Sequence, residues 1–189
     1  MIQRRRLAVD RIESTPMPRP LRRMTLSDAM ILVAVTAAGF ATARACLRVM
    51  PGSDPDFTTR MTAVFVALAL TIALIPLRLR RPRPRRPGRL PGMVACCAVA
   101  LAMAFNLAEQ AMSWLKPATG PALVEPHYRT INLVFNLLRL DLYSPAVAGG
   151  WLALALSGRW RPEPDWLDRA GRALGVCWIV SPLIVSWVS

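Results

Sequence analysis

The sequence has few of the residues from which catalytic and metal sites are usually built. It contains one histidine, His127, and four cysteines, none in C-x-x-C spacing. Zinc sites and redox pairs need several such ligands close together, so we expect neither, and we expect no cofactor. H-E-x-x-H, P-loop and G-x-G-x-x-G patterns are absent, and no serine lies near His127 in the sequence. We therefore expect a protein that is not an enzyme.

Acidic residues are also scarce, and charge is kept apart from apolar sequence. There are 24 basic and 11 acidic residues, a net charge of +13, although 54% of the chain is hydrophobic. The apolar runs are nearly free of charge, and the charges gather between them. This separation is typical of multi-pass membrane proteins. We predict an all-α integral membrane bundle of about five transmembrane helices, with one interfacial amphipathic helix.

Five apolar runs approach the length needed to cross the bilayer, which is about 20 helical residues for ~30 Å of hydrocarbon. All lie in one predicted transmembrane domain, residues 25–189. Residues 1–24 are basic and proline-containing, and we interpret them as a flexible cytoplasmic arm. The predicted spans lie near 26–47, 58–77, 92–114, 143–157 and 168–188.

Two of these runs begin with patterns typical of helix N-termini. Thr25 and Asp28 have the spacing of a capping box, in which each side chain accepts from the other residue's backbone N–H. Asp165 and Asp168 fit an N-cap residue and an acid in the first helical turn. Pro182 interrupts the last run, and we expect neighbouring helices and Ser181 to satisfy the carbonyl that this proline leaves without a donor.

The stretch 129–142 has helical periodicity but is too short and polar to cross a membrane alone. Its apolar residues fall on one face and its polar residues on the other. We predict an amphipathic helix lying at the outer interface. The polar face comprises Arg129, Asn132, Asn136 and Arg139.

Lysine and arginine are unevenly distributed between the runs. There are seven in 1–26, seven in 77–91 and four in 158–172, against three each in 44–60 and 116–142. The positive-inside rule assigns the heavier side to the cytoplasm. We therefore predict a protein of the cytoplasmic (inner) membrane, with its N-terminus in the cytoplasm and its C-terminus outside.

The stretch "LRLRRPRPRRPGRLPG", residues 77–92, is the most basic part of the chain. We interpret its arginines mainly as topological anchors that also contact acidic phospholipids. It contains no aromatic residue to stack on bases, so we do not expect nucleic acid as a partner. The candidate lipid contacts are Arg78, Arg80, Arg81, Arg83, Arg85, Arg86 and Arg89.

Small residues recur every four positions in three of the runs, which lets helix backbones approach closely. We expect these rows to pack mainly within the bundle, and an interface with a second copy or a membrane partner is the alternative. The rows are Ala37, Ala41 and Ala45; Ala63 and Ala67; and Ala100, Ala104 and Ala108.

One polar cluster is expected on the outer side, where the third run ends. Glu109 could pair with Arg129 or Arg139, take up a proton, or simply reach water. If it is functional, the protein would be a small transporter or channel component. The candidate residues are Asn106, Glu109, Gln110, His127, Asn132, Asn136 and Arg139.

The basic arm followed by "MTLSDAMILVAVTAAGFA", Met24–Ala41, resembles the opening of uncharacterised bacterial multi-pass membrane proteins. The resemblance covers about a tenth of the chain and implies a membrane protein without an assigned activity. We expect this first run to remain as an uncleaved anchor, since the chain after it is again apolar. Our leading hypothesis is a non-enzymatic membrane protein that packs with itself or with a membrane partner.

Overall fold

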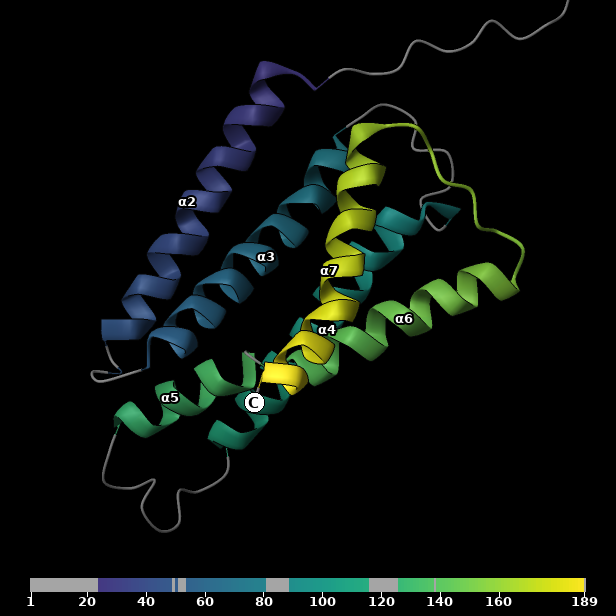
Figure 1. The fold of residues 1–189 in the computed structure, drawn as a ribbon. Coiled ribbons are helices and arrows are strands. Elements are labelled where there is room, and N and C mark those ends of the chain that lie inside the picture. Colours follow the sequence, from purple (N-terminus) through teal and green to yellow (C-terminus); the bar gives the residue numbers. More distant parts are fainter. Residues whose placement is uncertain are drawn as a thin grey trace, which may run out of the picture.

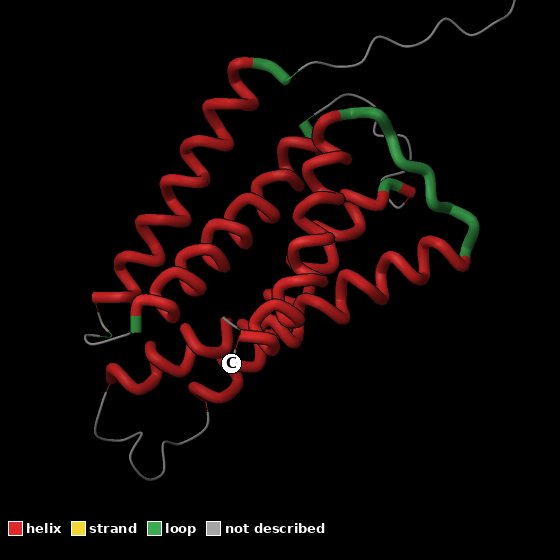
Figure 2. Tube along the Cα trace, viewed as in Figure 1, coloured by secondary structure: helices red, strands yellow, loops and turns green. Residues whose placement is uncertain are grey.

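The computed structural model describes residues 24–48, 50, 54–80, 89–115, 126–137 and 139–188. Within these ranges the regular secondary structure is helical and there is no strand, so the all-α prediction is confirmed (Figures 1 and 2). The helices are α2 (Leu26–Arg48), α3 (Pro55–Leu79), α4 (Pro91–Leu115), α5 (Pro126–Leu137), α6 (Leu140–Leu156) and α7 (Trp166–Val188).

Three stretches among the described residues are long and apolar enough to cross a membrane. They are α2, α3 and the part of α4 from Pro91 to Met112. Helix α6 has only 17 residues, about 25 Å at the rise of an α-helix. The five-span arrangement is therefore not established by helix length and composition alone.

The first two long helices begin at side-chain caps. Thr25 N–H donates to Asp28 Oδ2 and Asp28 N–H donates to Thr25 Oγ1, both at 3.2 Å, so the predicted capping box is confirmed. Helix α3 begins after Asp54, whose Oδ1 accepts from Asp56 N–H at 3.3 Å. Pro55 follows at the first helical position, where its missing N–H costs nothing.

Helices α2 and α3 form an antiparallel hairpin along one side of the molecule (Figure 1). Gly39 lies where the backbones meet, because a Cβ there would lie 2.9 Å from the Cα of Val66. Ala43 continues the contact one turn later and packs with Met61 and Phe65. The close approach thus uses Gly39 and Ala43.

The other helices pack around α4, which contacts α3, α5, α6 and α7. A central cluster joins Val99 of α4 to Val147 of α6 and Trp178 of α7. Trp178 Nε1 donates to the buried hydroxyl of Thr71 on α3 at 3.1 Å. The indole N–H is therefore satisfied inside the bundle, as a buried donor must be.

The chain breaks between α5 and α6, and residues 129–142 are not one helix. Two carbonyls at the end of α5 are taken by side chains from elsewhere. Asn106 Nδ2 donates to the Asn136 carbonyl at 2.7 Å, and the Tyr143 hydroxyl donates to the Leu137 carbonyl at 3.2 Å. These bonds satisfy carbonyls that the end of α5 leaves without a helical donor. Helix α6 begins three residues earlier than the predicted fourth span.

Pro182 lies within α7, as the last predicted span requires. The carbonyl four residues earlier, that of Trp178, loses its helical donor because proline has no N–H. Ser181 Oγ donates to that carbonyl at 3.2 Å. The predicted role of Ser181 is therefore confirmed.

Candidate functional site

A network of charged side chains joins α3 to the start of α7. Arg78 lies in the last turn of α3 and its side chain is only 11% exposed. Its Nη2 donates to Glu163 Oε2 at 2.6 Å and its Nη1 to Asp165 Oδ2 at 2.8 Å. A guanidinium can hold two carboxylates in this way because its donors form a planar fork. Arg78 therefore fastens the loop before α7 to the end of α3.

A second carboxylate contact joins α4 to α7. The buried Asp168 accepts from Gly92 N–H at 2.9 Å and from Glu163 N–H at 3.1 Å, and Arg172 lies 3.2 Å away on the next turn. The N-terminus of α4 supplies a donor that has no partner within its own helix. Glycine is needed on both sides, since a Cβ on Gly171 would lie 2.7 Å from the Gly92 carbonyl oxygen.

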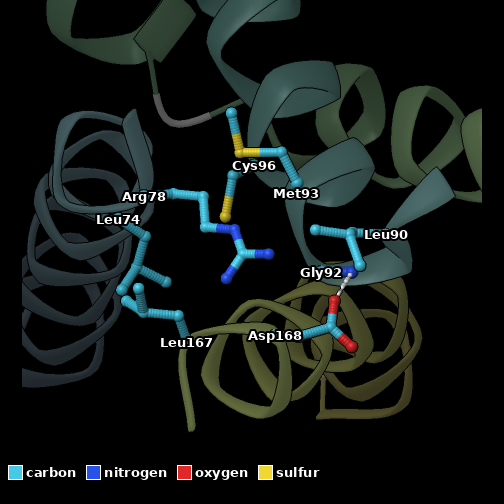
Figure 3. Close-up of a pocket in the computed structure, with 8 residues that line it drawn as sticks. All are labelled: Leu74, Arg78, Leu90, Gly92, Met93, Cys96, Leu167 and Asp168. Carbon is cyan, nitrogen blue, oxygen red and sulfur yellow. Dashed lines mark hydrogen bonds between the residues drawn. The ribbon is translucent and has the colours of Figure 1, made fainter. Parts of the chain in front are cut away.

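A cavity of about 10 Å³ lies between these two contacts. The Arg78 guanidinium points into the space between Cys96 and Asp168 (Figure 3). Its Nε has no hydrogen-bond partner among the described residues. This volume is about that of one water molecule and far below that of a substrate pocket. Across the described ranges, no group of three potential metal ligands comes together.

The loop between α6 and α7 starts with a left-handed turn and is tied to the start of α4. Gly158, at φ 63°, directs the chain out of α6, and Arg159 N–H closes the turn by donating to the Leu154 carbonyl at 3.2 Å. Farther on, Arg161 N–H donates to the Arg89 carbonyl at 3.2 Å. The loop therefore lies beside Arg89, just before α4 begins.

Tryptophans reinforce the same junction. Trp151 Nε1 donates to the Pro91 carbonyl at 2.9 Å. Trp160 packs edge-on against Trp151, with 5.8 Å between the ring centroids, and remains 39% exposed. The loop thus presents one aromatic ring beside its arginines.

The structure separates the candidate lipid contacts. Arg78 is buried and held by two carboxylates, so it is not offered to a lipid headgroup. Arg80 is exposed and Arg89 is half-buried. Four members of the set lie outside the described residues: Arg81, Arg83, Arg85 and Arg86.

The outer polar cluster is brought together only in part. Asn106 is 2% exposed and donates to the Asn136 carbonyl, and Gln110 is buried one turn farther along α4. Asn136 Nδ2 approaches Asn132 Oδ1 at 3.4 Å on the exposed side. The cluster therefore contains buried amides where α4 meets the end of α5.

Glu109 is exposed and makes no ion pair with Arg139. Arg139 instead pairs with Asp141 at 2.9 Å, and that hydrogen bond lowers the pKa of Asp141 below its usual value. The same bond raises the pKa of Arg139 above its usual value. The negative charge of Glu109 also raises the pKa of Arg139, but by less than Asp141 does. The side chains of His127 and Arg129 lie outside the described residues.

The predicted small-residue rows mostly face outward. Helix α2 presents an exposed row, and within the bundle it packs through Gly39 and Ala43 instead. Ala67 and Ala100 are partly buried. The exposed members are Ala37, Ala41, Ala45, Ala63, Ala104 and Ala108.

Sequence reasoning did not anticipate the Arg78 network. Its partners lie 85 and 87 residues away, so no periodicity connects them. One signal was available, namely that Glu163, Asp165 and Asp168 crowd into an otherwise basic loop. Counting only lysine and arginine, as the positive-inside rule does, conceals this signal.

No protein-family model, curated protein or solved structure matches this chain. The class is therefore defined by the fold alone: the regular structure of the described residues is all helical, and three of their helices are long and apolar enough to cross a membrane.

Proposed function

We propose that the chain is a non-enzymatic protein of the cytoplasmic membrane that crosses it five times. In this proposal the N-terminus is cytoplasmic, the C-terminus is outside, and the protein packs with a second copy of itself or with a membrane partner. The basic segments 77–91 and 158–172 both face the cytoplasm.

The packing of α6 and α7 supports five spans. Trp151 of α6 bonds to the first residue of α4, and Tyr143 packs in the central cluster with Val99. Helix α6 is therefore antiparallel to α4. Asp168 of α7 bonds to Gly92, and Trp178 reaches that central cluster, so α7 runs in the same direction as α4. Along α4 these contacts extend from Pro91 to Val99, so both helices pack beside the first part of a helix that can itself span.

A pair of topology reporters tests this arrangement. One is fused after Ser189 and the other is inserted in the 77–91 linker. We expect an external signal from the first and a cytoplasmic signal from the second. A cytoplasmic C-terminus would contradict five spans, and α6 would be the first helix to reconsider because it is the shortest of the candidate spans.

The exposed outward face of α2 is the observation that supports packing with another chain. Only 11% of its apolar window is buried, against 39% for α3. Ala37, Ala41 and Ala45 lie along this exposed face at spacing that permits close helix approach. Lipid covers any apolar face, but a row of small side chains also suits another helix.

Substitution of the row by a larger residue tests this packing. We expect Ala41→Leu to weaken self-association, measured by energy transfer between labelled copies in a bilayer. Ala155→Leu on α6 is the matched control, because Ala155 is also exposed and belongs to none of the predicted rows. Equal association of both variants and the unchanged chain would contradict self-packing through α2, and co-purification of a fixed partner lost in Ala41→Leu would assign the face to that partner.

A second candidate function, transport through the Glu109 region, is favoured by the buried amides of Asn106 and Gln110 beside it. Polar side chains at membrane depth often mark a pathway. Proton flux into vesicles should then fall with Glu109→Gln while insertion is retained. Unchanged flux, or none in the unsubstituted protein, would reject this function.

A further inference from the structure

We propose that the loop between α6 and α7 and the segment leading into α4 form one binding surface for anionic phospholipid headgroups. The surface, here called the two-loop surface, consists of Arg80, Arg89, Arg159, Trp160, Arg161 and Arg169. This inference rests on the proposed membrane location. It adds residues of the loop between α6 and α7 to the lipid contacts expected from the 77–91 linker, with which that loop shares no sequence motif.

Backbone hydrogen bonding makes the two-loop surface one structural unit. The Arg161 N–H to Arg89 carbonyl bond joins the segments directly, although they lie 72 positions apart. The Arg78 ion pairs hold the same loop to α3, and the Gly92–Asp168 bond holds α4 to α7. The loop therefore lies across the ends of several helices (green in Figure 2).

The carboxylates at this end do not neutralise the surface arginines. Glu163 and Asp165 are bound by Arg78, and Asp168 is bound by backbone N–H groups with Arg172 beside it. None of the five surface arginines has an ion pair within the described residues. Their positive charge is therefore left for an outside anion.

Trp160 indicates that the anion belongs to a lipid in the membrane. Partly exposed tryptophans are enriched at the level of lipid headgroups, where one side of the ring is apolar and the other is wet. Trp160 directly separates Arg159 from Arg161 in the sequence and packs against Trp151 of α6, whose indole N–H bonds to the first residue of α4. Arginine is also well suited to phosphate, which it can bind through two parallel hydrogen bonds.

Native mass spectrometry of the full chain in detergent tests the proposal. The protein is offered equal parts of phosphatidylglycerol and phosphatidylcholine, and the ratio of the retained lipids is measured. The test variant combines Arg159→Gln, Arg161→Gln and Arg169→Gln. The matched control combines Arg44→Gln, Arg48→Gln and Arg60→Gln, which removes the same charge from three exposed arginines at the opposite end.

We expect the unsubstituted chain to prefer phosphatidylglycerol and the test variant to lose on the order of tenfold to a hundredfold of that preference. The control, and a variant with lysine at the three test positions, should retain most of it, because charge near the headgroups is the main contribution. Equal losses in test and control would show that net charge alone decides, and would overturn the proposal.

Inorganic phosphate distinguishes a lipid from a free anion. Excess phosphate should not displace phosphatidylglycerol from the unsubstituted chain, since the lipid is also held by its acyl chains. Displacement would assign the surface to free phosphate and overturn the lipid proposal. The topology reporters and the Ala41→Leu assay do not depend on lipid preference, so failure here is distinguishable from failure of the proposed function.

Discussion

The two ends of the helix bundle are held together by different chemistry. At the end where α3 finishes and α7 starts, the buried Arg78 binds two carboxylates of the loop before α7, and the buried Asp168 binds backbone N–H groups of α4 and of that loop. At the opposite end, the buried group is the neutral amide of Asn106, and the ion pair between Arg139 and Asp141 is more than half exposed. The basic end thus has a buried, paired set of charged groups inside the bundle, whereas the ion pair at the other end is exposed.

This difference determines which substitutions should destabilise the folded protein. Breaking a buried ion pair leaves an uncompensated charge in a low dielectric, whereas exposed pairs are screened by water. A protein that merely carried positive charge for topology would need no buried network at its basic end. The network shows that this end is also a packed interface between helices.

The largest effect is expected at Arg78. Arg78→Ala should lower the free energy of unfolding by about 3–5 kcal/mol, because Glu163 and Asp165 then lose their cation. Steric trapping in bicelles would measure the change. Arg139→Ala is the control from the other end and should have only a marginal effect. Equal destabilisation of the two variants would contradict the view that the buried ion pairs of one end stabilise the fold more than the exposed pair of the other.

The glycine contact between α4 and α7 is the next most sensitive point. Gly92→Ala and Gly171→Ala should each cost about 1–3 kcal/mol, as overpacking does. The new Cβ at Gly92 would clash with the Asp168 carbonyl oxygen, and the one at Gly171 would lie 2.7 Å from the Gly92 carbonyl oxygen. Gly149→Ala on α6 meets no atom within 4 Å and should be neutral or slightly stabilising. Thermal unfolding in detergent compares the three, and tolerance at Gly171 would argue against close α4–α7 packing.

The amide at the opposite end should contribute less. Asn106→Ala removes a single neutral hydrogen bond to the Asn136 carbonyl and should cost about 1 kcal/mol. The same unfolding measurement applies, with the exposed Asn132→Ala as the control. A loss as large as that for Arg78→Ala would show that the buried amide matters as much as the ion network.

The smallest effect concerns pH at the exposed pair. The pKa of Asp141 is lowered in the folded protein, so its stabilising contribution is present above the unfolded pKa, near 3.8, and is lost as pH falls through the lower folded pKa. Carboxyl-carbon NMR of labelled protein should find the Asp141 pKa below 3.8, and Arg139→Gln should bring it back up. An unchanged pKa in that variant would show that the pair does not persist in solution.

Local features of the fold could be predicted from sequence, while contacts between distant segments could not. The capping box at Thr25 depends on neighbours three residues apart, and Ser181 acts on a carbonyl in its own helix. Both follow from helical spacing. The carbonyls at the end of α5 accept instead from Asn106 and Tyr143, which lie 30 and 6 positions from their partners, so helical spacing does not predict these bonds.

The same distinction explains the candidate sites. The seven arginines of the linker looked equivalent because sequence gives charge and position but not burial, and only the fold removes Arg78 from the set. The direction in which the α2 alanine row faces was also undetermined, because small residues suit an internal and an external helix contact equally. Gly39 and Ala43 fill the internal role.

The Arg78 ion pairs also fix an order of events during synthesis. Arg78 is made 85 residues before Glu163 and 87 before Asp165, so it must wait, charged and without these partners, while α4, α5 and α6 emerge from the ribosome. The network can close only once the start of α7 has arrived. A nascent chain halted before residue 163 would therefore hold its first helices with the end of α3 still unfastened, and the basic end is completed only when the loop before α7 and the start of α7 have been made.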